Sequence, residues 1–220
     1  MRPLTEAVPK PALALVDRPF LAHMIERLAG HGASEVVLAC GFLPDVLREA
    51  LAGEDLRAGA KIRYVAEPEP LGTAGAIRFA ADELGGELDD RFLALNGDVL
   101  TDLDLSALLR VHEERGAVAT IGLHPVEDSS AFGLVHSGDG GEVVEFLEKT
   151  GERKPGEVNA GMYVLEPWVV GLVARGEQVS MLDVLARVID RDETVGAFEV
   201  DDDWLDVGQR EQLRRAREGS

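Results

Sequence analysis

The chain has 220 residues, of which 45% are hydrophobic, and its 41 acidic and 22 basic side chains give a formal net charge of −19. A chain of this length forms one domain by default and can bury a core of its own. The negative charge argues against nucleic acid or an anionic membrane as a partner, because both require positive surface. No apolar run approaches the roughly 18 residues of a membrane span, and no basic start leads into an apolar stretch.

The single cysteine and the few lysines indicate which environment and which kind of ligand site suit this chain. Cys40 cannot form an internal disulfide, which favours a reducing cytoplasm, and its context "EVVLACG" is typical of a buried small residue rather than a nucleophile. An anionic ligand would require local cations or a metal in so acidic a chain. Only four lysines are present, and two of them, Lys10 and Lys149, lie in motifs.

The first half of the chain alternates predicted helices and strands. "RPFLAHMIERLAGHGA" has Leu21, Met24, Ile25 and Leu28 at helical spacing before Gly30. There follow a strand ("SEVVLAC"), a helix ("PDVLREALAG"), a strand ("KIRYVAE"), a helix over 73–84, a strand ("RFLALNGD") and a helix ("DLSALLRVHEERG"). This order predicts a doubly wound, mostly parallel α/β sheet of Rossmann-like type.

Past residue 116 the pattern changes to short strands separated by turns. "AVATIGLHPV", "FGLVHS", "EVVEFLEK" and "NAGMYVLE" are predicted strands, and "SMLDVLARVID" is a predicted helix. We expect a mixed sheet in this second half, without a separate domain boundary, so that residues 1–220 form one domain. Ligands of such sheets bind at the carboxyl ends of the strands.

Two aspartates stand out at predicted strand ends. Asp98 follows the buried strand "RFLAL", where a carboxylate suits Mg²⁺, although taken alone a turn or capping role is favoured. Asp206 in "DDDWLDVGQREQL" lies on the face opposite Leu205 and Val207, and it could equally be the N-terminal anion of a last helix.

Three further stretches contain weaker signals. In "EPEPLGTAGAIRFAADEL", Gly72 and Gly75 allow close backbone approach and Thr73 can cap the helix that follows, which hints at an anion or nucleotide. Lys149 is the second-last residue of "EVVEFLEKT" and matters only if it is aimed at a phosphate. Asn159 and Gly161 begin "NAGMYVLEP", where they could meet sugar hydroxyls or form a bulge before an edge strand.

The order of these motifs resembles a known family. "RPLT…PKP", "EPLGTAGA", "LNGDV", "FLEK", "NAGMYVLEP" and "WLDVG" occur in sequence over residues 2–208. Together they are similar to the sugar-1-phosphate nucleotidyltransferases, which make nucleotide sugars from a nucleoside triphosphate and a sugar 1-phosphate. The mannose-1-phosphate guanylyltransferases of that family have similar "EPLGTAG" and "NAGMY" stretches. A glucose-1-phosphate thymidylyl- or uridylyltransferase is the alternative within the family.

The resemblance implies a role for each motif residue and a Mg²⁺ cofactor. Asp98 and Asp206 would bind the metal, Lys10 the nucleotide phosphates, and Lys149 the phosphate of the sugar 1-phosphate. The base would lie against Glu67 and Gly72, with Thr73 as a further substrate-binding residue beside them. The sugar pocket would contain Gly133, Glu148, Asn159 and Gly161. A homo-oligomer fits the resemblance as well. The acyltransferase-like repeat domain of some relatives is not expected, because the chain stops soon after "WLDVGQREQL".

Two features of the sequence bear on specificity and on activity. Glu67 offers only acceptor atoms, which match the N1–H and N2–H₂ groups of guanine better than thymine or uracil, so GTP is the expected nucleotide. In the family a glycine-rich loop precedes "RPLT", whereas Met1 stands where that loop would end. An upstream start codon is the favoured explanation. A truncated enzyme and a non-catalytic nucleotide-sugar-binding subunit are the alternatives.

Overall fold

The computed structural model describes residues 10–12, 14–15, 18–41, 44–52, 59–86, 88, 90–101, 104–200 and 204–206. The chain divides into two compact units. Unit 1 comprises Met1–Pro70, Gly97–Thr101 and Leu205–Ser220, and unit 2 comprises Leu71–Asn96 and Asp102–Trp204. None of the described helices is long and apolar enough to cross a membrane.

Unit 1 contains the first alternating segment of the chain. Its elements are η1 (Lys10–Ala12), β1 (Ala14–Leu15), β2 (Arg18–Pro19), α1 (Phe20–Gly30), β3 (Glu35–Cys40), α2 (Pro44–Ala52), β4 (Lys61–Ala66) and β6 (Val99–Thr101), joined by the end of β12 (Trp204–Asp206). β3 and β4 pair in parallel, from Glu35 opposite Lys61 to Cys40 opposite Ala66. The predicted helices and strands of this segment are confirmed, including a first helix that buries Leu21, Met24 and Ile25.

Unit 2 is built on a four-stranded mixed sheet. Its elements are α3 (Gly72–Glu83), β5 (Phe92–Leu95), α4 (Leu105–Glu114), β7 (Ala119–Val126), β8 (Leu134–Ser137), β9 (Val143–Leu147), β10 (Gly156–Leu165), α5 (Pro167–Val170), α6 (Met181–Ile189) and β11 (Val195–Glu199). The strand order is β11-β7-β10-β5, with β8 and β9 forming a separate hairpin. β7 and β11 are parallel, whereas β10 runs antiparallel to both of its neighbours.

The mixed α/β class is therefore confirmed, with one difference in the pairing. "RFLAL", expected as a third parallel strand, is β5, and its partner among the described residues is the antiparallel strand β10. A strand's periodicity shows which of its faces is buried but not which neighbour it will pair with. β10 lies between β7 and β5, so the alternative of an edge strand at "NAGMYVLE" is wrong.

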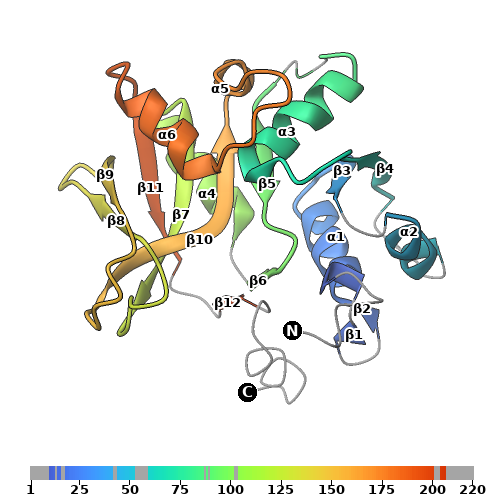
Figure 1. Ribbon diagram of the computed structural model, residues 1–220, viewed down its shortest axis with the longest axis horizontal. Coiled ribbons are helices and arrows are strands. Elements are labelled where there is room, and N and C mark those ends of the chain that lie inside the picture. The colour runs from blue at the N-terminus through green and yellow to red at the C-terminus, as the bar shows by residue number, and fades with distance from the viewer. Residues whose placement is uncertain are drawn as a thin grey trace. The chain divides into compact units, whose positions relative to one another are not determined.

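Helices cover both faces of the unit 2 sheet (Figure 1). α6 and α3 lie on the near face in that view, and α4 lies behind the sheet. Met181, Val184, Leu185 and Val188 of α6 are almost fully buried in the core, and each such side chain contributes about 1.5–3 kcal/mol relative to exposure. Because α6 packs against the sheet in this core, the strands hold the loops at their ends in fixed positions.

Two helix starts in unit 2 follow from local side chains. Asp104 is the N-cap of α4, and its side chain accepts from the amides of Ser106 and Ala107. Ser180 begins α6 with a capping box, in which Ser180 Oγ accepts from the Asp183 amide while Asp183 Oδ2 accepts from the Ser180 amide.

Candidate functional site

The residues predicted to form the site divide between the two units. Unit 1 contains Lys10, Glu67, Asp98 and Asp206, four of the residues assigned to the nucleotide or the metal. Unit 2 contains Gly72, Thr73, Gly133, Glu148, Lys149, Asn159 and Gly161. The side chains of Lys10 and Asp206 lie outside the described part of the chain, so only the backbone places these two residues.

The segments that contain Lys10, Asp98 and Asp206 lie together in unit 1. Asp98 occupies the turn directly before β6, and β6 pairs with β12, the strand that ends at Asp206. In the same turn, a Cβ built on Gly97 would lie 3.4 Å from Pro11 Cγ, so the turn packs against η1 beside Lys10. Two carboxylates on paired backbone segments are a donor set that suits a hard divalent cation.

Glu67 lies at the carboxyl ends of the parallel pair β3–β4, where a ligand site is expected. Its amide donates to Cys40 O at 3.0 Å. Its carboxylate lies beside the backbone of Gly41, with Oε1 3.7 Å from a Cβ built there. Burial, followed by the charge of Glu67, raises the pKa of the Cys40 thiol to about 11. Cys40 is therefore a buried, protonated residue, as predicted.

The glycine-rich turn that opens α3 packs tightly against residues 177–181. Gly72 has φ +74°, and a Cβ on it would lie 2.6 Å from Val179 O, while a Cβ on Gly75 would overlap the carbonyl oxygen of Glu177. The expectation that Thr73 caps α3 is wrong, because α3 has no side-chain cap and Thr73 Oγ1 accepts from the Met181 amide at 2.8 Å. Gly72 and Gly75 therefore allow two backbone segments to pack closely, independently of any ligand that the turn contacts.

Gly133 and Lys149 come together at the β8–β9 hairpin. A Cβ on Gly133 would lie 2.8 Å from Leu147 O and 4.0 Å from the Lys149 amide nitrogen. Glu148 and Lys149 follow the end of β9 and are exposed, in a stretch without regular secondary structure. Within the part of the chain that the structure describes, Lys149 has no carboxylate at ion-pair distance, whereas Lys61 and Lys154 each have one. Lys149 is thus available to an anionic ligand.

The loops on either side of this hairpin are tied to each other. The Ser129 amide and Oγ both donate to Lys154 O, at 3.0 and 2.8 Å, and Arg153 Nε donates to Asp128 Oδ2 at 2.7 Å. Hydrogen bonds from Ser130, and then from Arg153, lower the pKa of Asp128 to about 2. Asp128 therefore stays ionised at neutral pH, and the pair of loops is held on both sides of Gly133 and Lys149.

Asn159 and Gly161 form a bulge in β10. The register with β7 shifts between Asn159 and Tyr163, and Gly161 has φ +75°, a conformation that favours glycine. Asn159 Oδ1 accepts from the Gly161 amide at 2.8 Å, and Asn159 Nδ2 donates to Tyr163 Oη at 2.6 Å. Burial raises the pKa of Tyr163 to about 12, so the phenol stays protonated and fixes the Asn159 amide.

Three residues near this bulge were not selected from the sequence. Trp204 Nε1 donates to Ala160 O at 2.9 Å, and the Trp204 ring stacks on His124 at a centroid distance of 4.8 Å. The Asn96 amide donates to Gly161 O at 2.8 Å, which joins the bulge to the end of β5 two residues before Asp98. Only the position of Trp204 within "WLDVG" could have indicated its role, since a single aromatic residue is ordinarily a core residue.

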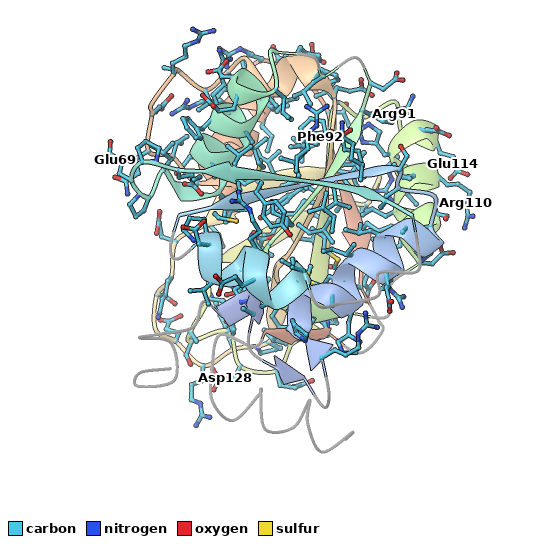
Figure 2. All side chains as sticks on the ribbon, turned by 90° about the vertical axis from the view of Figure 1, so that its right-hand side faces the viewer. Glu69, Arg91, Phe92, Arg110, Glu114 and Asp128 are labelled. Carbon is cyan, nitrogen blue, oxygen red and sulfur yellow. The ribbon has the colours of Figure 1, made fainter. Side chains whose placement is uncertain are left out.

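Arg91, the residue directly before β5, lies at the opposite end of that strand from the β10 bulge. Arg91 precedes β5 and binds Glu113 of α4 at 2.8 Å, and Phe92, the first residue of β5, pairs with Leu165 at the end of β10. In Figure 2, Arg91, Phe92, Arg110 and Glu114 are labelled in the upper part of the view, and Asp128 is labelled in its lower part. Arg91 is thus at the amino end of β5, whereas the bulge and Asn96 are at its carboxyl end.

Comparison with solved structures shows the fold. HddC from Yersinia pseudotuberculosis superimposes with a TM-score of 0.81 and 23% sequence identity, covering 96% of this chain and 90% of that one. A putative glucose-1-phosphate thymidylyltransferase from Bacillus anthracis superimposes with a TM-score of 0.83 and 20% identity, covering 99% of this chain and 89% of that one. The chain shares the α/β fold of these proteins.

Comparison of sequences shows the family. The family model described as nucleotidyl transferase matches residues 1–219, so the chain belongs to the nucleotidyl transferase family. The mannose-1-phosphate guanylyltransferase of Mycobacterium tuberculosis is 37% identical over 217 residues, covering 98% of this chain and 59% of the relative. The mannose-1-phosphate guanyltransferase of Yarrowia lipolytica is 34% identical, covering 95% and 57%. The chain thus spans less than two thirds of the length of these relatives.

Proposed function

We propose that the chain transfers a nucleotidyl group from a nucleoside triphosphate, GTP in the first place, to a sugar 1-phosphate, giving a nucleotide sugar and pyrophosphate. Mannose 1-phosphate is the favoured acceptor, because the relatives named above bear that activity in their names. The observation that carries the proposal is the hydrogen-bonded Asn159–Gly161 bulge, in which Gly161 O accepts from the amide of Asn96, two residues before Asp98 in the sequence. The amide of Asn159 and the bare backbone of Gly161 suit the hydroxyl groups of a sugar. The carboxylate of Asp98 follows Asn96 by two residues.

The chemistry requires few protein groups. The attacking phosphate oxygen of the sugar 1-phosphate is already ionised, so no general base is needed, and the chain has only to position the substrates and neutralise charge. Lys149 would bind the acceptor phosphate, and Lys10 the triphosphate. Asp98 and Asp206 would hold Mg²⁺, which when bound screens the phosphates against the acidic protein. The Asn159 amide, fixed by Tyr163, would orient the sugar hydroxyls.

The proposal is tested by nucleotide-sugar formation with GTP and mannose 1-phosphate, comparing wild type with Lys149→Ala. Loss of one charged hydrogen bond of about 1.5–3 kcal/mol is expected to lower kcat/KM for the sugar 1-phosphate by roughly 10- to 100-fold, with little change in the KM for GTP. Lys154→Ala is the matched control, because the Lys154 side chain already faces Glu152 at 3.8 Å.

Two outcomes would contradict these assignments. If Lys149→Ala behaves like Lys154→Ala, Lys149 does not bind the acceptor. If wild type makes no nucleotide sugar with any of GTP, dTTP and UTP, yet binds GDP-mannose in calorimetry, the chain is a binding subunit and the transfer reaction is wrong.

Glu67→Gln tests the proposed reading of guanine. The carboxylate accepts two hydrogen bonds from guanine, and such a bidentate pair is worth about 1–3 kcal/mol of discrimination. The variant is expected to lower the ratio of kcat/KM for GTP over dTTP by roughly 5- to 100-fold. Glu69→Gln is the control, since Glu69 is an exposed carboxylate two residues away (Figure 2). An unchanged GTP/dTTP ratio in Glu67→Gln would show that other groups read the base.

A further inference from the structure

The segment between α5 and α6 has no regular secondary structure at residues 177–180, yet it is firmly bonded to the start of α3. The Val179 amide donates to Leu71 O at 2.9 Å, and Val179 O accepts from the amides of Ala74 and Gly75 at 3.2 and 3.4 Å. Both backbone polar groups of Val179 are therefore bonded to the glycine-rich turn. The Val179 side chain is 7% exposed and belongs to the hydrophobic core of unit 2.

The bonding between the two segments is reciprocal. Thr73 Oγ1 accepts from the Met181 amide at 2.8 Å, at the first residue of α6. Because the amides of Ala74 and Gly75 already donate to Val179 O, these two groups of the α3 N-terminus are not available to a phosphate. A nucleotide can then meet the exposed backbone of Gly72 and Thr73, where close approach suits a flat base rather than a triphosphate.

The ion pair between Glu177 and Arg187 fixes the first residue of the 177–181 segment. Arg187 Nη2 of α6 binds Glu177 Oε1 at 2.6 Å, and Arg187 Nη1 donates to Leu172 O at 3.0 Å. Glu177 Oε2 also accepts from the Ala174 amide at 2.8 Å. The hydrogen bond from Arg187 is the largest cause that lowers the pKa of the Glu177 carboxyl. Arg187 thus joins α6 to Leu172, near the start of the loop that precedes α6, and to Glu177, where the 177–181 segment begins.

We propose that Glu177 and Arg187 are positioning residues for the nucleotide, acting through the 177–181 segment on the backbone of Gly72 and Thr73. A shift of the 177–181 segment would displace the backbone of Gly72 and Thr73 directly, because the two segments are closely packed. The Glu177 carbonyl lies against Gly75, and the Val179 carbonyl lies 2.6 Å from where a Cβ on Gly72 would be, so a displaced segment cannot leave the turn unchanged. The inference rests on the proposed function and on the further premise that the base of the nucleotide lies against the backbone of Gly72 and Thr73.

The test compares Glu177→Gln and Arg187→Met with the charge-exchanged double variant Glu177→Arg/Arg187→Glu. The single variants are expected to raise the KM and the calorimetric Kd for GTP by roughly tenfold. The KM for mannose 1-phosphate and kcat should stay within about twofold, because the sugar pocket lies on other loops. Partial recovery of the GTP affinity is expected in the double variant. Arg175→Met is the matched control, since exposed Arg175 pairs with Asp82, 3.4 Å away, and not with the 177–181 segment.

Hydrogen exchange gives a readout that does not depend on turnover. The amides of Ala74 and Gly75 should exchange faster in Glu177→Gln than in wild type, with β7 and β10 unchanged. If the GTP affinity of Glu177→Gln equals that of wild type, or if the affinities for both substrates fall equally with a lower melting temperature, the positioning role is wrong. If wild type itself does not bind GTP, the proposed function fails, and the inference fails with it for that separate reason.

Discussion

Replacing Asp98 by Asn is expected to abolish turnover, lowering kcat by roughly 1000-fold or more, while the fold is retained. Asn has the shape of Asp without its charge, and Asp98 lies in a partly exposed turn where the substitution leaves no cavity. The proposed metal would lose one of its two carboxylates, so the protein would bind it more weakly and the charge of the phosphates would be screened less. Nucleotide-sugar formation at a series of Mg²⁺ concentrations, together with circular dichroism, measures both parts of the prediction.

Asp206→Asn is expected to behave in the same way, because β12, which ends at Asp206, pairs with β6 directly after Asp98. Asp139→Asn is the control, since Asp139 is an exposed carboxylate in the turn before β9 and no role is assigned to it. Near-normal activity in Asp98→Asn or Asp206→Asn would overturn the metal assignment. A loss of activity that high Mg²⁺ restores would instead show that the carboxylate acts on metal affinity alone.

Gly75→Ala is expected to destabilise the protein by about 3 kcal/mol, which corresponds to a fall in melting temperature of roughly 6–12 °C. A Cβ at this position would overlap the carbonyl oxygen of Glu177 and would also approach Leu71 Cβ to 2.9 Å. Neither atom can rotate away, because the Glu177 oxygen belongs to the backbone and the position of Leu71 Cβ is fixed by its own backbone. The two segments are also joined, since Val179 is hydrogen-bonded to the same turn. Thermal unfolding followed by circular dichroism gives the result.

Gly30→Ala provides the comparison for Gly75→Ala. Gly30 ends α1, and a Cβ built there meets nothing within 4 Å. Alanine in a helix is favoured over glycine by about 0.5–1 kcal/mol, so this variant should melt at or slightly above the wild-type temperature. A Gly75→Ala variant as stable as Gly30→Ala would mean that the 177–181 segment moves freely from α3, which would remove the basis of its positioning role as well.

Much of the local structure follows from short-range physics and could be predicted from residues alone. The first helix follows from the spacing of Leu21, Met24 and Ile25, and β3 from its compact apolar run. Asp104 as the N-cap of α4 depends only on the nearby amides that it accepts from. The family was likewise readable from the order of the motifs over residues 2–208, because each motif is contiguous in the chain.

Contacts between distant segments were decided by the tertiary structure. Thr73 is bonded to Met181 instead of its own helix, and β5 pairs with β10, because cores and neighbouring strands set these partners and sequence spacing does not encode them. The same reason explains Trp204, whose indole binds the carbonyl of Ala160 in the β10 bulge. The sequence by itself determined which residue types are present for the proposed chemistry, and in which motifs. Long-range packing determined which backbone holds each of them in place.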